Sequence, residues 1–180
     1  LFIPGPEVNL EAVLYETASP WAMLVCHPHP LYGGTMDNSV VTVMFDIGVK
    51  LQINTIKFNF RGAGQSTGTY GHITGEVEDT KAVVDFLNNR GSPKKIILCG
   101  YSFGGAVATQ FLDKYHSDAI ILIAPPLSMF DFSTLYRFDG PKLIVIGQSD
   151  DFTPQAQIQN FVENLKGETH FKTFAQANHF

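Results

Sequence analysis

The chain has 180 residues, of which 44% are hydrophobic and 16% charged, and its formal net charge is −5 at pH 7. This length fits a single domain over residues 1–180, and the low charged fraction predicts a large core rather than disorder. Only 12 residues are Lys or Arg, without a basic cluster, which argues against a nucleic-acid partner. No apolar run approaches the roughly 18 residues of a membrane span, and the first residues lack a signal-peptide pattern. We therefore expect a cytoplasmic domain without a membrane span.

Short runs rich in β-branched residues alternate along the chain with longer stretches of helical periodicity. The first two predicted strands, residues 11–16 and 21–26, are separated by a short connection, which favours an antiparallel hairpin at one edge of a sheet. Further strands are predicted at residues 54–60, 95–99, 119–124, 142–146 and 169–174, and helices at residues 39–51, 76–89, 103–115 and 154–165. This alternation predicts an α/β fold with a mostly parallel sheet covered on both faces. Cys26 and Cys99 end apolar runs and are predicted as buried thiols rather than a disulfide.

Residues 125–141 interrupt the alternation with an aromatic-rich stretch that has no clear periodicity. Loops that follow the carboxyl ends of parallel strands border the ligand crevice of an α/β sheet. The segment is therefore a candidate for a small cap over a site. Its aromatic side chains fit equally well a loop that is merely anchored to the core, and both interpretations stay open.

The sequence GYSFG at residues 100–104 carries the strongest functional signal. It lies between a predicted buried strand and a predicted helix, the setting in which G-x-S-x-G forms a tight strand-to-helix turn with the serine at its apex. The flanking glycines make room for that turn, and the helix N-terminus favours negative charge that develops near the serine. We predict Ser102 as a catalytic nucleophile.

A serine nucleophile needs a histidine base and an acid that orients the base, and in this fold class the acid precedes the histidine along the chain. Asp150 and Asp151 follow the predicted strand 142–146. Only one of them can face the site, because successive residues of an extended chain point in opposite directions. His179 follows the last predicted strand at the same sheet edge and is the candidate base. The residues alone leave the choice between the two aspartates open.

The loop HPHPLYGG at residues 27–34 follows a predicted strand, where the second oxyanion donor is expected beside the backbone N–H of Phe103. We predict the backbone N–H of His29 as this donor, with Leu31 as the alternative, since proline has no N–H. His27 and His29 also have the appearance of a metal-ligand pair, but no nearby side chain completes a zinc site.

The segment RGAGQST at residues 61–67 begins like a dinucleotide-binding fingerprint. The residues that follow it predict a loop, so no helix N-terminus would face a pyrophosphate. We therefore expect neither a nucleotide cofactor nor a metal.

With these motifs in view, the chain resembles the α/β-hydrolase superfamily, and within it small bacterial hydrolases akin to dienelactone-hydrolase-like and serine-aminopeptidase-like proteins. The matches span nearly the whole chain and are HPHP at 27–30, YGGTMDN at 32–38, FNFRGAGQSTG at 58–68, Gly75-Glu76 with Asp79, GYSFGG at 100–105, Gly147 with Asp150 and Pro154, and ANHF at 177–180. The resemblance implies a three-layer sandwich around a sheet of about eight strands, with an antiparallel N-terminal edge and a minimal cap.

The resemblance also implies the roles of the site residues, with Ser102 as nucleophile, Asp150 as acid and His179 as base. It favours Asp150 over Asp151 through the spacing of Asp150 from its neighbouring glycine and proline. Two departures stand out. Asn178 occupies a position where the family usually has Asp, and the family continues with a C-terminal helix that we expect to be missing here.

The sequence thus predicts a serine hydrolase that cleaves a carboxylic ester, thioester or amide of a small-molecule acyl substrate through an acyl-enzyme. A short cap favours a carboxylesterase of small esters. An aminopeptidase-like amide hydrolase is the alternative among enzymes, and a non-catalytic binding protein on the same fold is the alternative outside them. A homodimer is compatible with the sequence.

Overall fold

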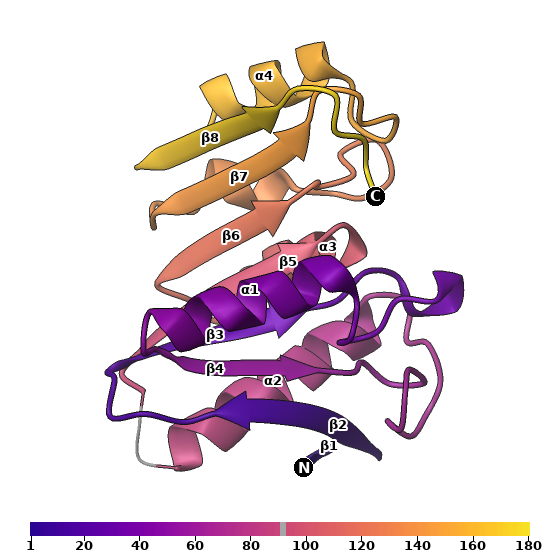
Figure 1. Ribbon diagram of the computed structural model, residues 1–180, viewed down its shortest axis with the longest axis vertical. Helices are drawn as coiled ribbons and strands as arrows, with labels where there is room; N and C mark the ends of the chain where they lie inside the picture. Colours follow the sequence, from indigo (N-terminus) through magenta and orange to yellow (C-terminus); the bar gives the residue numbers. More distant parts are fainter. Residues whose placement is uncertain (91–92) are drawn as a thin grey trace.

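The computed structural model describes residues 1–90 and 93–180 and contains, within these residues, an eight-stranded sheet (Figure 1). The strand order is β1-β2-β4-β3-β5-β6-β7-β8. The strands are β1 (Phe2–Gly5), β2 (Val8–Tyr15), β3 (Trp21–Cys26), β4 (Asn54–Phe58), β5 (Lys95–Tyr101), β6 (Ala119–Ile123), β7 (Lys142–Gly147) and β8 (Thr169–Phe174). The α-helices are α1 (Ser39–Lys50), α2 (Thr74–Asn89), α3 (Phe103–Phe111) and α4 (Gln155–Glu163), and two 3-10 helices are η1 (Pro30–Tyr32) and η2 (Ser133–Tyr136).

Helices cover both faces of the sheet, which confirms the predicted three-layer α/β architecture. Side chains of α2, α3 and α4 join one apolar cluster, and α1 packs through Val41 and Met44 into a second cluster on the other face. In Figure 1, α1 lies in front of the sheet, and α2 and α3 lie behind it. Along the sheet from β4 through β3, β5, β6 and β7 to β8, neighbouring strands pair in parallel. β1 and β2 form an antiparallel edge, as expected.

The expected hairpin between residues 11–16 and 21–26 is wrong. β2 pairs antiparallel with β4, and β4 separates it from β3. The side chain of Asn54, at the start of β4, accepts a hydrogen bond from the N–H of Thr17 at 2.7 Å and donates to the carbonyls of Ser19 and Trp21 at 2.8 and 3.1 Å. This buried amide ties the connection from β2 to β3 across the end of β4, so the short connection crosses a strand instead of forming a hairpin.

The partner that β2 does form in a hairpin is β1, a strand that the sequence does not predict. β1 is four residues long and contains Pro4, and proline is tolerated in a strand only where its missing N–H is not needed, as at a sheet edge. No helix in residues 1–90 or 93–180 has the length and apolarity to cross a membrane.

The two cysteines are free and fully buried, as predicted. Cys26 belongs to the cluster packed by α2 and α3, and Cys99 belongs to the cluster packed by α1. The thiols therefore lie on opposite faces of the sheet, which prevents a disulfide. Burial raises the pKa of the Cys26 thiol to about 12 and raises the pKa of the Cys99 thiol well above its usual value.

Parallel pairing brings the carboxyl ends of β3, β5, β7 and β8 to one edge of the sheet. The segments that leave these ends are the loop 27–38, the turn at Ser102, the turn 148–154 and the segment 175–180 (Figure 1). The candidate site residues lie in these four segments, except Phe103, which is the first residue of α3.

Candidate active site

Ser102 stands alone between β5 and α3 in a strained backbone conformation, with φ 53° and ψ −119°. A non-glycine residue in such a region costs on the order of 1–3 kcal/mol and persists only where its surroundings enforce it. The surroundings here are close backbone contacts. A Cβ on Gly104 would overlap the carbonyl oxygen of Cys26, and a Cβ on Gly100 would overlap the backbone of Gly104. The predicted strand-to-helix turn is therefore present, with its serine at the apex.

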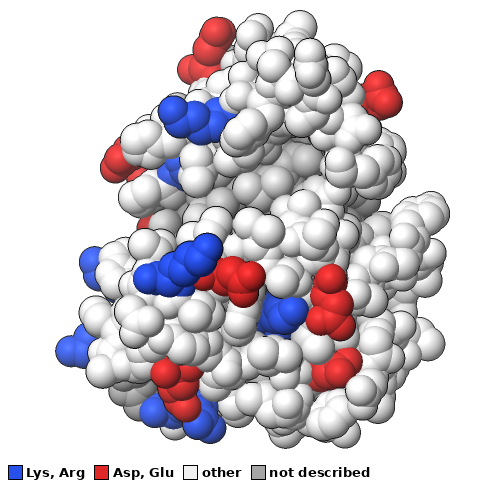
Figure 2. Space-filling model, viewed as in Figure 1, with Lys and Arg blue, Asp and Glu red and all other residues white. Residues whose placement is uncertain are grey.

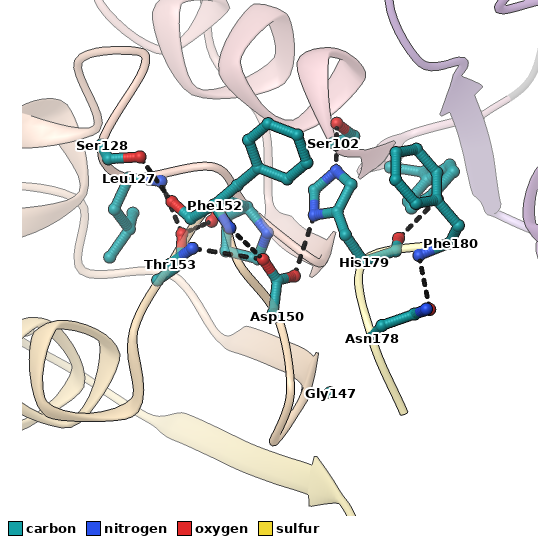
Figure 3. A network of polar contacts seen from close by, with 12 residues as sticks. Ser102, Leu127, Ser128, Gly147, Asp150, Phe152, Thr153, Asn178, His179 and Phe180 are labelled. Atoms are coloured by element: carbon teal, nitrogen blue, oxygen red, sulfur yellow. Dashed lines mark hydrogen bonds and ion pairs between the residues drawn. The ribbon is translucent and has the colours of Figure 1, made fainter. Parts of the chain in front are cut away.

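Ser102, His179 and Asp150 form a continuous hydrogen-bonded chain (Figure 3). The Ser102 Oγ lies 2.8 Å from His179 Nε2, and His179 Nδ1 lies 2.8 Å from Asp150 Oδ2. The His179 and Asp150 side chains are 6% and 0% exposed, so the pair is shielded from water. A carboxylate on Nδ1 fixes the proton there and leaves Nε2 free to accept the proton of the serine hydroxyl.

The other oxygen of Asp150 is held by the backbone. Its Oδ1 accepts hydrogen bonds from the N–H groups of Phe152 and Thr153 at 2.9 and 3.2 Å. Two backbone donors stabilise the ionised carboxylate and fix its direction towards His179. Asp151 is exposed to solvent. Of the two aspartates left open by the residues, the structure therefore brings Asp150 to the histidine.

His179 is also fixed by two contacts that the sequence does not reveal. The buried hydroxyl of Tyr101 donates a hydrogen bond of 2.7 Å to the backbone carbonyl of His179. The Phe152 ring packs on the imidazole at a centroid distance of 4.5 Å. Tyr101 is the variable second residue of the GYSFG motif, which gives no hint of this role, and Phe152 is marked only by its place next to the two aspartates.

The two predicted oxyanion donors lie beside the serine. His29 and Phe103 both line the cavity that contains Ser102, and their rings are in contact at a centroid distance of 4.5 Å. Within residues 1–90 and 93–180, neither of their backbone N–H groups donates to a protein acceptor. The N–H of the alternative donor, Leu31, instead donates to His29 Nδ1 at 3.2 Å. His29 therefore suits the role of second donor better than Leu31.

His27 is a structural residue of the same loop. Its ring is fully buried, with Nε2 accepting a hydrogen bond from the N–H of Phe60 at 3.0 Å and Nδ1 lying 2.5 Å from the carbonyl oxygen of Pro28. Burial lowers the pKa of His27 to about 4, which keeps the ring neutral. Both ring nitrogens have backbone partners, so neither has a free lone pair for a metal.

The segment that resembles a dinucleotide fingerprint is a loop, as predicted, and α2 begins only at Thr74. Arg61 at its start forms an ion pair with the buried Asp79 of α2, with 2.7 Å between Nη2 and Oδ1. This pair holds the loop against the helix.

A cavity of about 500 Å³ opens in front of Ser102. Besides Ser102, its walls are formed by Pro28, His29, Tyr32, Gly33, Gly34, Asn38, Tyr101, Phe103, Pro126, Met129, Phe130, Phe152, His179 and Phe180. Within the described part of the chain, no Asp, Glu, Lys or Arg lines this cavity. On the face shown in Figure 2, charged side chains lie over α1, around the upper and left edges and over the lower part, whereas the outermost part of the lower right edge is white.

Residues 125–141 border the site and are also anchored to the core. Met129 and Phe130 line the cavity, whereas Phe132 and Leu135 are buried in the main apolar cluster. The segment therefore borders the site as a short, anchored loop.

Comparisons with known proteins agree with the fold. A family model described as serine aminopeptidase, S33, matches residues 49–135. The structure of an alpha-beta serine hydrolase homologue from Coxiella burnetii is 36% identical, with a TM-score of 0.92 over 100% of this chain and 88% of that chain. A serine hydrolase without lid from Xanthomonas campestris is 28% identical, with a TM-score of 0.87 over 99% of this chain and 84% of that chain. An uncharacterized protein of Rickettsia prowazekii is 33% identical, with a match that covers 100% of this chain and 81% of that protein.

Proposed function

Because the chain belongs to the serine hydrolases of the α/β-hydrolase superfamily, we propose that it hydrolyses carboxylic esters with Ser102, His179 and Asp150 as its catalytic triad. The observation that carries the proposal is the pair of 2.8 Å contacts that joins the strained serine to the imidazole and the imidazole to the carboxylate. A structural histidine would not need this order of partners.

The proposed reaction has two halves. His179 Nε2 takes the proton of Ser102 as Oγ attacks the ester carbonyl, and Asp150 stabilises the imidazolium that forms. The N–H groups of Phe103 and His29 bind the oxygen of the tetrahedral intermediate. When the bond to the leaving alcohol breaks, His179 gives its proton to the alcohol oxygen. Water, deprotonated by His179, then attacks the acyl carbonyl. As the bond to Ser102 Oγ breaks, His179 returns the proton to Oγ, which releases the carboxylic acid and the free serine.

An ester substrate is favoured over an aminoacyl amide by the lining of the cavity. A free α-amino group is positively charged at neutral pH, and its burial without a carboxylate partner is unfavourable. No acidic side chain lines the cavity in residues 1–90 and 93–180. An uncharged ester can be buried without a carboxylate partner.

The test combines labelling of the serine with a comparison of two substrates. A fluorophosphonate probe is expected to label Ser102, and the Ser102→Ala variant is expected to remain folded and unlabelled. The wild-type protein is expected to hydrolyse 4-nitrophenyl acetate faster than alanine 4-nitroanilide. Folded wild-type protein that resists the probe would refute the serine mechanism, and faster anilide cleavage would make the protein an aminopeptidase.

A further inference from the structure

One side of the cavity is formed by aromatic rings in contact with one another. The ring centroid of His29 lies 4.5 Å from that of Phe103, and Phe103 lies 5.6 Å from Phe130. Tyr32, 4.8 Å from His29, extends the cluster to the rim of the cavity. Phe103 is only 1% exposed, so His29, Phe130 and Tyr32 present the surface and Phe103 supports them from below. We call these four residues the aromatic wall.

The aromatic wall carries no formal charge. Burial lowers the pKa of His29 from its ordinary value near 6.5, so its ring is neutral at pH 7, and Nδ1 is occupied by the N–H of Leu31. The remaining cavity lining within the described residues also lacks Asp, Glu, Lys and Arg. A charged substituent bound here would lose its hydration without gaining an ion pair, which is unfavourable.

The position of the wall relative to the triad indicates which half of an ester it contacts. The leaving oxygen must receive its proton from His179 Nε2, so the alcohol part lies on the side of His179 and Phe152. The ring neighbours of His179 are Tyr101, Phe152 and Phe180. His29 and Phe103 contact each other instead, and Phe103 contacts Phe130. His29 and Phe103 are also the proposed donors to the carbonyl oxygen. The group next to the aromatic wall is therefore the other substituent of the carbonyl carbon, which is the side chain of the acyl group.

We propose that the acyl group of the substrate contains an uncharged aromatic ring that packs against the aromatic wall, an inference that rests on the serine-hydrolase function proposed above. Aromatic pairs at centroid distances of about 4.5–7 Å gain more than their buried area alone provides, through edge-to-face or offset contacts. Met129 also lines the cavity, and a methionine thioether is a favourable neighbour for a ring. A volume of about 500 Å³ lies within the usual range for binding an organic molecule of this size.

The sharpest test compares the 4-nitrophenyl esters of phenylacetic acid and cyclohexylacetic acid. The two acyl groups have nearly the same size, and the methylene group insulates the carbonyl from the ring in both, so aromaticity is the main difference. We expect kcat/KM to be about fivefold higher for the phenylacetyl ester, in line with the energy of an aromatic pair. A third ester with a carboxylate on the phenyl ring is expected to react about a hundredfold more slowly, because the cavity offers no partner for the charge.

Two matched variants locate the preference in the wall. Phe130→Leu removes a ring from the wall but keeps an apolar side chain, and it is expected to lower the phenylacetyl-to-cyclohexylacetyl ratio to near one. Phe2→Leu makes the same change on β1, where the side chain is 54% exposed and does not line the cavity. This control is expected to keep the wild-type ratio.

The outcomes separate this inference from the proposed function. Equal or faster hydrolysis of the cyclohexylacetyl ester, an unchanged ratio in Phe130→Leu, or rapid hydrolysis of the carboxylated ester would overturn the aromatic acyl group while leaving a labelled, active Ser102 intact. If the fluorophosphonate probe does not label Ser102, the serine mechanism itself fails, and the inference fails with it.

Discussion

The turn that carries Ser102 and the turn that carries His179 lie side by side at one edge of the sheet, yet different forces hold them. Ser102 is fixed by backbone packing, because Gly100 and Gly104 have no room for a Cβ and the serine has a positive φ of 53°. The backbone before His179 also packs closely, against Gly147, and the carbonyl of Ala177 accepts a hydrogen bond from the N–H of Ser149. His179 itself is fixed by side chains, through the Tyr101 hydroxyl, the Asp150 carboxylate and the Phe152 ring.

This difference determines how far each group can be displaced by a single substitution. The nucleophile can be moved only by changing the backbone around it, which also threatens the fold. The base can be moved or misoriented by removing one polar atom, with the fold left in place. A substitution in the turn that carries Ser102 is therefore expected to lower stability, and one in the turn that carries His179 is expected to lower mainly activity.

The largest effect is expected from Asp150→Asn. Asn can still accept the hydrogen bonds from Phe152 and Thr153, but its amide N–H₂ faces His179 Nδ1 and favours the wrong tautomer. We expect kcat for 4-nitrophenyl acetate to fall about 10⁴-fold, with an unchanged circular dichroism spectrum. The matched control is Asp151→Asn at the exposed neighbour, whose kcat is expected to stay within about twofold of wild type, as is usual for an exposed site. Comparable losses in the two variants would contradict the assignment of Asp150.

Gly104→Ala tests the steric side of the comparison. The new Cβ would meet the carbonyl oxygens of Cys26 and His27, and backbone atoms cannot move aside as a flexible side chain can. We expect a loss of about 4 kcal/mol or more in the free energy of unfolding, measured by urea denaturation.

Gly105→Ala is the control for that variant, because its Cβ would lie 3.3 Å from a side-chain atom, Leu122 Cδ2. Its cost is expected to stay below about 1 kcal/mol, since alanine also favours the helix. Similar stability of the two variants would show that packing around the turn at Ser102 is looser than these contacts indicate.

A smaller effect is expected from Tyr101→Phe, which removes the donor to the His179 carbonyl and keeps the ring. We expect kcat to fall about tenfold, corresponding to one lost buried hydrogen bond, while KM stays within twofold of wild type because the base is misplaced and the cavity is not. Tyr115→Phe removes a hydroxyl that contacts Glu78 far from the site and should leave kcat unchanged. A wild-type kcat in Tyr101→Phe would rule out a positioning role for its hydroxyl.

Sequence reasoning found the features that depend on neighbouring residues. The turn at Ser102 follows from glycines within two positions of the serine, and the strands and helices follow from local periodicity. Without the family resemblance, the residues did not separate Asp150 from Asp151, because the choice depends on two backbone donors in a turn and on a histidine 29 residues away. The Tyr101 contact with His179 joins residues 78 positions apart and has no local signal.

The prediction of the strand pairing was wrong for the same reason. The connection between β2 and β3 is short enough for a hairpin, and only the insertion of β4, with Asn54 bonded to Thr17, Ser19 and Trp21, excludes it. β1 was missed because Pro4 weakens the strand pattern in a segment that is stable only through its pairing with β2. Both features depend on contacts that form after the chain has folded.

The two buried thiols have a practical consequence for work on this protein. Cys26 and Cys99 lie on opposite faces of the central sheet, and only an ionised thiol reacts readily with an alkylating reagent. The rate at which iodoacetamide modifies them therefore measures how often the centre of the protein opens, with Cys26 reporting the side of α2 and α3 and Cys99 the side of α1. The native chain thus contains one probe for local unfolding on each side of the sheet.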